Sequence, residues 1–418
     1  MILEIHLSNF YSIKEEVVLN LLAGNSKSRK VRELEENVFD FKNDKILKTI
    51  ALYGANASGK SSIIKAISFC CSMVFQSHTH NEDVQFNFVP FKFDGFPEKP
   101  SSFMIRFVSK SVEYEYAFSL TRNKILTESL FYYPKGKRAM VFIRDESHTG
   151  KKSHKYSFTN VIKKPMAVAE NTSDKTLYVS RASQMDRELG KELFTFFRDH
   201  FILGLYGFNS FNIEHQLKEN KKLMVEALQI ADSDIVDIKM VKREIPVKSF
   251  SLTLPAATAT IKDEQKEVFQ IKTYHKASPG IAFDFGTEES EGTKKLFVIL
   301  LSVLDIIKTN KILLIDEIES SLHPRIVEFI IKLFYISKSA QLIFTTHDTK
   351  LLDLAKIRKD QIYFVNKRTD ASTDLYSLFD YKDFRENMDV EKAYLQGRFD
   401  AVPYINDSND NIKSLING

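Results

Sequence analysis

The fold of this chain is decided by the stretch Gly54-Ala55-Asn56-Ala57-Ser58-Gly59-Lys60-Ser61, which matches the phosphate-binding pattern G-x-x-x-x-G-K-[ST] at every fixed position. The run before it, Thr49–Tyr53, has the composition of a buried strand, and the run after it, Ser62–Val74, has an apolar helical face. The pattern needs this context, because backbone N–H groups then point into the turn and the positive end of the helix adds to their field. We expect Lys60 to reach the β- and γ-phosphates of a nucleotide and the Ser61 hydroxyl to bind Mg²⁺.

The bulk composition is that of an ordinary globular protein. The chain has 418 residues, of which 43% are hydrophobic and 27% charged, and this is enough for one large domain or for two to three smaller ones. The formal net charge of +4 is small, so any case for nucleic-acid binding depends on local clusters of Lys and Arg.

Three features predict a cytoplasmic protein. The only cysteines, Cys70 and Cys71, are neighbours on the helix predicted after the turn, and they are typical of core side chains in a reducing compartment. Residues 1–7 alternate like a strand and lack the basic start and apolar block of a signal peptide. The best apolar run, Leu296–Ile307, is too short to span a bilayer.

The chain divides into three parts by pattern. Residues 1–133 contain the phosphate-binding pattern followed by strand-rich segments, and residues 134–232 begin polar and basic and continue with mostly helical patterns over 184–230. Residues 233–418 start with strands and then alternate helices and strands, which predicts an α/β fold with a parallel-containing sheet. In this last part we predict a helix over Thr293–Ile307, a strand over Ile312–Asp316, a helix from Pro324 to Ile336 and a strand over Gln341–Thr345.

Two adjacent acids end an apolar run at Ile312-Leu313-Leu314-Ile315-Asp316-Glu317. Such a run is typical of a strand that is buried on both faces, and ligands of open α/β sheets bind at the carboxyl edge of the strands. Asp316 is placed to hold Mg²⁺, and Glu317 is placed to polarise the attacking water at a γ-phosphate. The alternative is a polar strand end that leads into a loop.

Two further short motifs offer polar groups at the ends of predicted elements. Glu289-Ser290-Glu291-Gly292-Thr293 starts a predicted helix and is either another anion site or an N-cap followed by a glycine. Thr345-Thr346-His347-Asp348 follows an apolar strand, where the histidine either contacts a γ-phosphate oxygen or is structural.

Together, and in this order, the motifs resemble those of the ATP-binding-cassette ATPase superfamily, specifically its SMC/RecF/OLD-like branch of soluble ATPases. Gly54–Ser62 is similar to its Walker A motif, and Ser290–Thr293 to its signature motif. Ile312–Glu317 is similar to Walker B followed by the catalytic glutamate. Ser320–Pro324 resembles the D-loop, and His347 the switch histidine.

A closer resemblance is to the RloA or abortive-infection type of AAA ATP-binding proteins, which are found beside bacterial phage-defence genes. It is carried by Pro90–Phe93, Glu289–Lys295 and Glu391–Pro403, and it spans nearly the whole chain. Two features depart from the branch. The Q-loop glutamine has no convincing counterpart, although Gln85 lies close to its expected place. The interval between Walker A and the signature also lacks sustained heptads, so we expect only a short arm.

The resemblance implies an α/β fold of the P-loop NTPase class, ABC/SMC-head-like, with a mixed sheet, a strand-rich N-terminal lobe and a short helical and basic insertion. It also implies an ATPase that uses ATP and Mg²⁺. Two copies would meet head to tail around shared ATP, and hydrolysis would release them. The implied nucleotide-binding residues are Gly54, Asn56, Ser58, Gly59, Lys60, Ser61, Ser62, Ser290 and Gly292, the catalytic residues Lys60, Glu317 and His347, and the metal ligands Ser61 and Asp316.

The basic segment 135–164 either contacts nucleic-acid phosphates or is a solvated loop. The function expected from the resemblance is an ATPase that senses nucleic acid and regulates an effector encoded nearby in anti-phage defence. The alternatives are a DNA-repair or chromosome-maintenance ATPase, a nucleotide-binding subunit of a transporter, and a non-hydrolysing scaffold. The cations expected to contact nucleic acid are Lys135, Lys137, Arg138, Lys151, Lys152 and Lys155.

Overall fold

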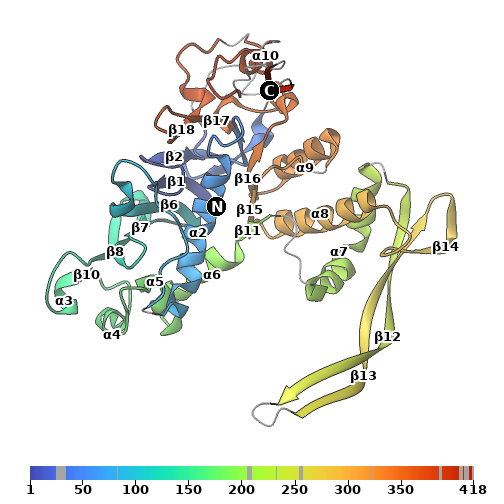
Figure 1. The fold of residues 1–418 in the computed structure, drawn as a ribbon, viewed down its shortest axis with the longest axis horizontal. Helices are drawn as coiled ribbons and strands as arrows, with labels where there is room; N and C mark the ends of the chain where they lie inside the picture. The colour runs from blue at the N-terminus through green and yellow to red at the C-terminus, as the bar shows by residue number, and fades with distance from the viewer. Residues whose placement is uncertain are drawn as a thin grey trace. The chain divides into compact units, whose positions relative to one another are not determined.

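The computed structural model (Figure 1) divides into two compact units. Unit 1 comprises Met1–Gly204 and Ile306–Gly418, and unit 2 comprises Leu205–Asp305. The three-part division expected from sequence patterns stays a prediction. The described residues are 1–24, 34–81, 83–204, 210–231, 233–253, 258–320, 322–385, 388–403, 408 and 414–416.

A six-stranded sheet forms the centre of unit 1. Its first five strands run parallel, and the last pairs antiparallel, so the sheet is mixed, as predicted. Every residue of its three central strands is buried, because helices or the second sheet cover both faces. The strand order is β11 (Phe201–Leu203), β15 (Ile312–Ile315), β16 (Gln341–Thr346), β5 (Thr49–Tyr53), β17 (Ile362–Lys367) and β18 (Thr373–Ser377).

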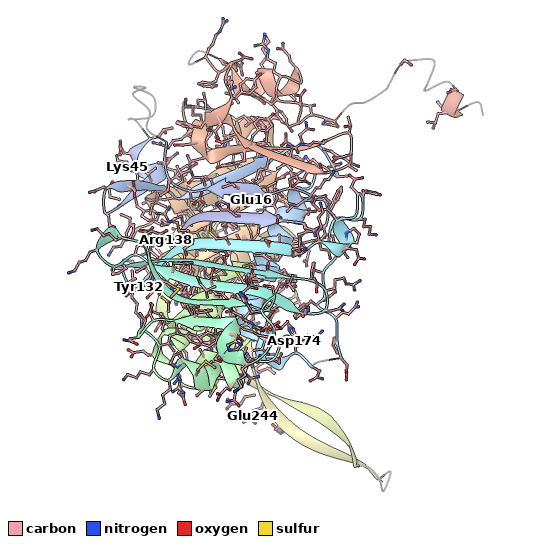
Figure 2. All side chains as sticks on the ribbon, turned by 90° about the vertical axis from the view of Figure 1, so that its left-hand side faces the viewer. Glu16, Lys45, Tyr132, Arg138, Asp174 and Glu244 are labelled. Carbon is pink, nitrogen blue, oxygen red and sulfur yellow. The ribbon has the colours of Figure 1, made fainter. Side chains whose placement is uncertain are left out.

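A seven-stranded antiparallel sheet forms the strand-rich part of unit 1, which confirms the strand-rich N-terminal prediction (Figure 2). In β6 and β7, buried residues largely alternate with half-buried ones, since one face of the sheet packs on the core. The order is β10 (Tyr156–Phe158), β9 (Ala139–Asp145), β8 (Ile125–Tyr132), β7 (Val112–Leu120), β6 (Ser101–Ser109), β1 (Ile2–Ser8) and β2 (Val17–Asn20), and a separate pair joins β3 (Val38–Phe41) to β4 (Asp44–Leu47).

Helix α2 (Lys60–Gln76) packs against both sheets, through β1 and β16, and its apolar residues join the main core. Cys70 and Cys71 lie in this core as free thiols, and burial raises the pKa of both. The other helices of unit 1 are α3 (Lys152–Lys155), α4 (Pro165–Glu170), α5 (Tyr178–Gln184), α6 (Glu188–Asp199), α9 (Pro324–Ile336) and α10 (Val390–Leu395). Short 3₁₀ turns lie at Glu35–Asn37, Ser77–Thr79, Phe96–Glu98, Pro134–Gly136, Thr349–Leu351, Lys359–Gln361 and Leu378–Asp380.

Unit 2 is built on a long antiparallel ribbon of two strands, β12 (Ile235–Thr253) and β13 (Thr258–His275). Strands of this length extend about 60 Å. At the base of the ribbon, β14 (Ser278–Asp284) adds a third strand and α7 (Ser210–Ile230) packs on β12. Helix α8 (Glu291–Lys308) begins in unit 2 and ends in unit 1. The arm between the phosphate-binding turn and the predicted signature is therefore a two-stranded β-ribbon.

Candidate nucleotide-binding site

The phosphate-binding turn joins β5 to α2, as the sequence predicts. Gly59 adopts a left-handed backbone with φ of 113°, and a Cβ added there would lie 2.0 Å from Thr373 Oγ1. A Cβ added at Gly54 would lie 2.2 Å from the carbonyl oxygen of Val365. Only glycine fits at either position, because a side chain at Gly59 is strained and both positions are closed by neighbouring atoms.

Lys60 lies at the first turn of α2 with only 6% of its surface exposed. Its ammonium group donates to the carbonyl oxygens of Gly54 at 2.8 Å and Ala55 at 3.0 Å. Burial lowers the pKa of Lys60, while the carboxylates of Asp316, Glu317 and Glu319 oppose that shift. The structure therefore places the lysine of the turn and the predicted acidic residues within electrostatic range of each other.

Asp316 and Glu317 follow β15 directly and are solvent-exposed at its carboxyl edge. The backbone of Glu317 is left-handed, with φ of 53°, a conformation that is uncommon outside glycine. Thr345, which is fully buried on β16, joins the two acids through its hydroxyl. The hydroxyl donates to Asp316 Oδ1 at 2.7 Å and accepts from the backbone N–H of Glu317 at 2.7 Å. The adjacent strand thus fixes the direction of the Asp316 carboxylate and the backbone of Glu317.

His347 follows β16 and is exposed at the same edge of the sheet. Its backbone N–H donates to Glu319 Oε1 at 2.6 Å, so the two strand ends are tied together. In the predicted D-loop, the backbone N–H of Ser320 donates to the carbonyl oxygen of Glu317 at 2.9 Å. Ser321 of this segment lies outside the described residues.

The predicted signature residues Ser290 and Gly292 belong to unit 2. Ser290 Oγ accepts from the backbone N–H of Thr293 at 3.0 Å, which is the geometry of an N-cap for α8. Around Gly292 the space is open, since an added Cβ would meet only Ser290 Oγ, at 3.7 Å. A role for either residue at a γ-phosphate stays a prediction.

His275 forms an ion pair with Glu289, the residue that precedes the predicted signature motif. His275 lies with Nε2 2.8 Å from Glu289 Oε1 and with Nδ1 2.8 Å from Asp234 Oδ1. A neutral imidazole has one N–H donor, so two carboxylate partners favour the imidazolium form. Burial lowers the pKa of His275, but the hydrogen bonds to Asp234 and Glu289 outweigh burial and raise it overall.

A comparison with protein families matches residues 50–353 to a family described as "AAA domain, putative AbiEii toxin, Type IV TA system". The chain belongs to this AAA family. The match covers the phosphate-binding turn, the two acids and the predicted switch histidine, and it supports ATP binding by a P-loop ATPase. No curated protein matches the sequence.

Solved SMC head domains are similar to this AAA family member over most of its length. The head bound to the C-winged helix domain of ScpA is 15% identical, covers 90% of this chain and 97% of its own, and has a TM-score of 0.40. The head domain from Thermotoga maritima is 14% identical over 90% of this chain and 98% of its own, with a TM-score of 0.39. A Pyrococcus furiosus head with an extended coiled coil, bound to the C-terminal domain of ScpA, is 14% identical over 95% and 98%, with a TM-score of 0.37.

The polar groups at the turn of this AAA family member fit a nucleotide with Mg²⁺. Ser58 Oγ is buried and has no hydrogen-bond partner among the described residues. At the start of an α-helix, N–H groups without helical partners and the helix dipole together favour an anion, and α2 starts at this turn. Ser61, at the start of α2, and Asp316 offer the hydroxyl and the carboxylate that Mg²⁺ takes beside phosphate oxygens.

Sequence reasoning missed the residues that hold the turn from outside. Ser12 Oγ donates to Ser62 Oγ at 2.8 Å, and the hydroxyl of Thr373 lies 2.8 Å from Ser12 Oγ and 3.1 Å from the carbonyl oxygen of Ser58. Ser12 and Thr373 lie 361 positions apart, so no local pattern signals their contact. Gln85, considered as a Q-loop residue, lines a polar cavity in the strand-rich part of unit 1.

The six cations predicted to contact nucleic acid do not form one patch. Lys135, Lys137 and Arg138 lie in the turn between β8 and β9, where Arg138 pairs with Glu115 at 2.5 Å. The other three lie in or beside α3, which follows the opposite end of β9. Figure 2 labels Arg138 at the left of the sheet, toward one end of its strands, and Asp174 at the lower right, toward the other end.

The described helices include none long and apolar enough to cross a membrane.

Proposed function

We propose that the chain is an ATPase whose heads associate around ATP and separate on hydrolysis. The supporting observation is the convergence of Lys60, Asp316 and Glu317 at the carboxyl edge of the parallel strands β5 and β15, which flank β16. Glu317 would polarise the attacking water, and the Lys60 ammonium would exchange its two carbonyl partners for phosphate oxygens. The second phosphate contact would come from Ser290 and Gly292 of another copy.

ATP promotes association in this proposal only through contacts that differ between the joined and the separate state. The γ-phosphate supplies that difference, because it would touch Lys60 of one copy and the N-terminus of α8 of the other. Loss of the γ-phosphate removes the bridge. The same nucleotide therefore drives both assembly and release, and the lifetime of the assembly depends on the rate at which Glu317 supports hydrolysis.

Two variants test this proposal. Glu317→Gln keeps ATP binding but removes the base, so we expect a longer-lived ATP-bound dimer and a loss of ATP turnover. Lys60→Ala removes the phosphate contact, so we expect no ATP-dependent dimer. Light scattering with and without ATP measures the mass, and phosphate release measures turnover. The control is Glu328→Gln, because Glu328 lies on α9 and forms a surface ion pair with Lys356. This variant should resemble the wild type in both assays. Equal monomer populations of Glu317→Gln and Lys60→Ala with ATP would contradict the proposal.

We further propose that this ATPase regulates an effector protein in anti-phage defence. The support is the description of the family, which refers to a putative AbiEii toxin. Purification of the chain with the products of its neighbouring genes, with and without ATP, tests this role. ATP-dependent co-elution of a nuclease or toxin is the expected result. Co-elution of repair or chromosome-maintenance proteins instead would favour the RecF/SMC type of function.

A further inference from the structure

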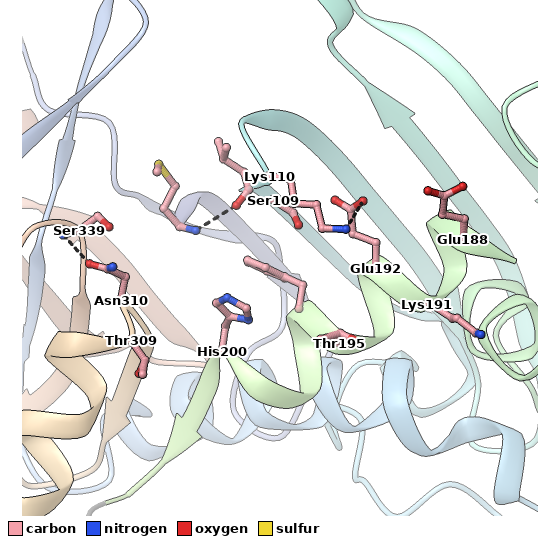
Figure 3. A pocket seen from close by; sticks show the side chains of 13 residues that line it. Ser109, Lys110, Glu188, Lys191, Glu192, Thr195, His200, Thr309, Asn310 and Ser339 are labelled. Atoms are coloured by element: carbon pink, nitrogen blue, oxygen red, sulfur yellow. Dashed lines mark hydrogen bonds and ion pairs between the residues drawn. The ribbon is translucent and has the colours of Figure 1, made fainter. Parts of the chain in front are cut away.

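Two cavities lined by described residues of unit 1 differ in charge. One, of about 550 Å³, lies beside α6, and there Lys110 pairs with Glu192 at 3.5 Å, so its charge is compensated (Figure 3). The other, of about 710 Å³, lies in the strand-rich part of unit 1. We call it the lysine cavity, because four of its lining residues are Lys124, Lys152, Lys155 and Lys175.

Two of these ammonium groups are held by neutral partners. Lys152 Nζ donates to the carbonyl oxygen of Thr172 at 2.8 Å, and Lys175 Nζ donates to the carbonyl oxygen of Val84 at 2.9 Å. A carbonyl fixes the direction of the side chain but does not cancel its charge. Each ammonium group has three N–H donors, so donors are left for a further acceptor.

The acids of the lysine cavity do not balance its cations. Glu146 accepts from Lys155 Nζ at 2.7 Å and from Arg144 Nε at 2.8 Å, so two cations already share its carboxylate. Arg144 is fully buried and also pairs with Glu128, at 3.7 Å. Asp83 and Asp174 are the other acids among the described lining residues, so four lysines face three carboxylates, one of which already pairs with Arg144.

We propose that the lysine cavity binds a terminal phosphate group, at a site separate from the turn that holds ATP. Lysine binds phosphate as a point charge, and the cavity volume lies within the range of small-molecule sites. A dianionic phosphate would offset the excess positive charge and occupy the remaining N–H donors. Burial lowers the pKa of Lys152, and although Glu146 and Asp174 oppose this shift, the pKa stays below its usual value. An added anion beside this ammonium group would favour its charged form.

Calorimetric titration of the full chain with inorganic pyrophosphate tests the site. The Lys60→Ala background removes binding at the ATP turn, so the remaining heat reports the lysine cavity. Because Lys152 contacts the ligand directly in this proposal, we expect Lys152→Gln in that background to weaken binding about tenfold or more. Lys151→Gln is the matched control, since Lys151 precedes α3, is exposed and does not line the cavity.

The outcomes separate a built site from general charge attraction. Binding to Lys60→Ala that persists in Lys151→Gln and weakens in Lys152→Gln supports the proposal. No binding to Lys60→Ala, or equal loss in the two glutamine variants, overturns it. If Lys152→Gln lowers the melting temperature, the exposed lining residue Lys124 takes its place as Lys124→Gln, with the same expected loss.

The phosphate group has two natural sources that a second titration distinguishes. One is a mononucleotide, and the other is the 5′ end of a nucleic acid. Tighter binding of a 5′-phosphorylated oligonucleotide than of its 5′-hydroxyl counterpart, lost in Lys152→Gln, supports the site with a nucleic-acid end as ligand. Binding of a mononucleotide, with the same loss, supports the site with a small ligand. Oligonucleotide binding that ignores both the 5′ phosphate and Lys152 counts against the site.

Discussion

Thr345→Val removes the hydroxyl that joins the two acids at the end of β15 while keeping the volume of the side chain. In the wild type this buried oxygen bonds Asp316 Oδ1 and the backbone N–H of Glu317, each at 2.7 Å. A hydrogen bond to a charged group contributes about 1.5–3 kcal/mol net, and a neutral one contributes about 1 kcal/mol. If about 2 kcal/mol of this orients the acids in the transition state, kcat falls about 30-fold, since each 1.36 kcal/mol is tenfold.

Steady-state ATP turnover measures the effect. The KM for ATP should stay near that of the wild type, because the phosphate-binding turn is unchanged. The control is Thr49→Val, which removes another fully buried hydroxyl, bonded to Gln361 Nε2 at 2.6 Å, at the opposite end of β5 from the turn. Both variants should lose comparable stability in thermal melts. The reasoning is refuted if Thr345→Val leaves kcat unchanged, or if Thr49→Val lowers it equally.

Two further substitutions test the turn and the ribbon base. Gly59→Ala should abolish ATP binding and lower the melting temperature, because the added Cβ would lie 2.0 Å from Thr373 Oγ1. The control Gly95→Ala should keep ATP binding, because Gly95 also has a positive φ, of 72°, but open space around it. ATP binding by both variants would contradict the argument from close packing. His275→Gln should lower the melting temperature most below about pH 6.5, where unfolded histidine is protonated, and the deficit should shrink as pH rises through the raised pKa of folded His275. A deficit that stays constant between about pH 5 and 9 would show that the carboxylate contacts of His275 do not depend on its charge.

The parts of the fold that depend on local patterns followed from the sequence. The helix predicted over Ser62–Val74 is Lys60–Gln76, and the predicted helix Pro324–Ile336 has those bounds in the structure. The strands before the turn and before the two acids were also found as predicted. In each case, the spacing of the apolar residues and the residues that start or end the element lie within about twenty positions, so the local sequence is enough to predict the element.

Short strands, and strand pairs that are distant in sequence, could not be predicted from local patterns. Strand β11 has three residues within the segment predicted as mostly helical, and it exists because it pairs with β15. Strand β10 has three residues in the segment described only as polar and basic, and its partner is β9. Strand patterns predicted strands over residues 234–286, but such patterns do not tell how long the pair formed by β12 and β13 is.

In the candidate site, too, residues of continuous motifs could be predicted, whereas residues that are distant in sequence could not. The motifs located Lys60, Asp316 and Glu317, because each motif is a continuous stretch. Thr345, which orients the acids, bonds Asp316 across 29 positions, and the bond depends on the register of two parallel strands. The cations of segment 135–164 show the converse case, since they are neighbours in sequence but lie beyond opposite ends of β9, and their contact with nucleic acid stays a prediction.

The place of β5 in its sheet sets the order in which a ribosome could deliver a working site. Both neighbours of β5 come from far downstream: β16 begins at Gln341 and β17 at Ile362. While most of the chain is being synthesised, both edges of β5 therefore lack their partner strands. Unpaired strand edges can form wrong pairs with other strands. A nascent chain halted in the ribbon lacks both neighbours of β5, so we predict that nucleotide binding requires translation to pass β17.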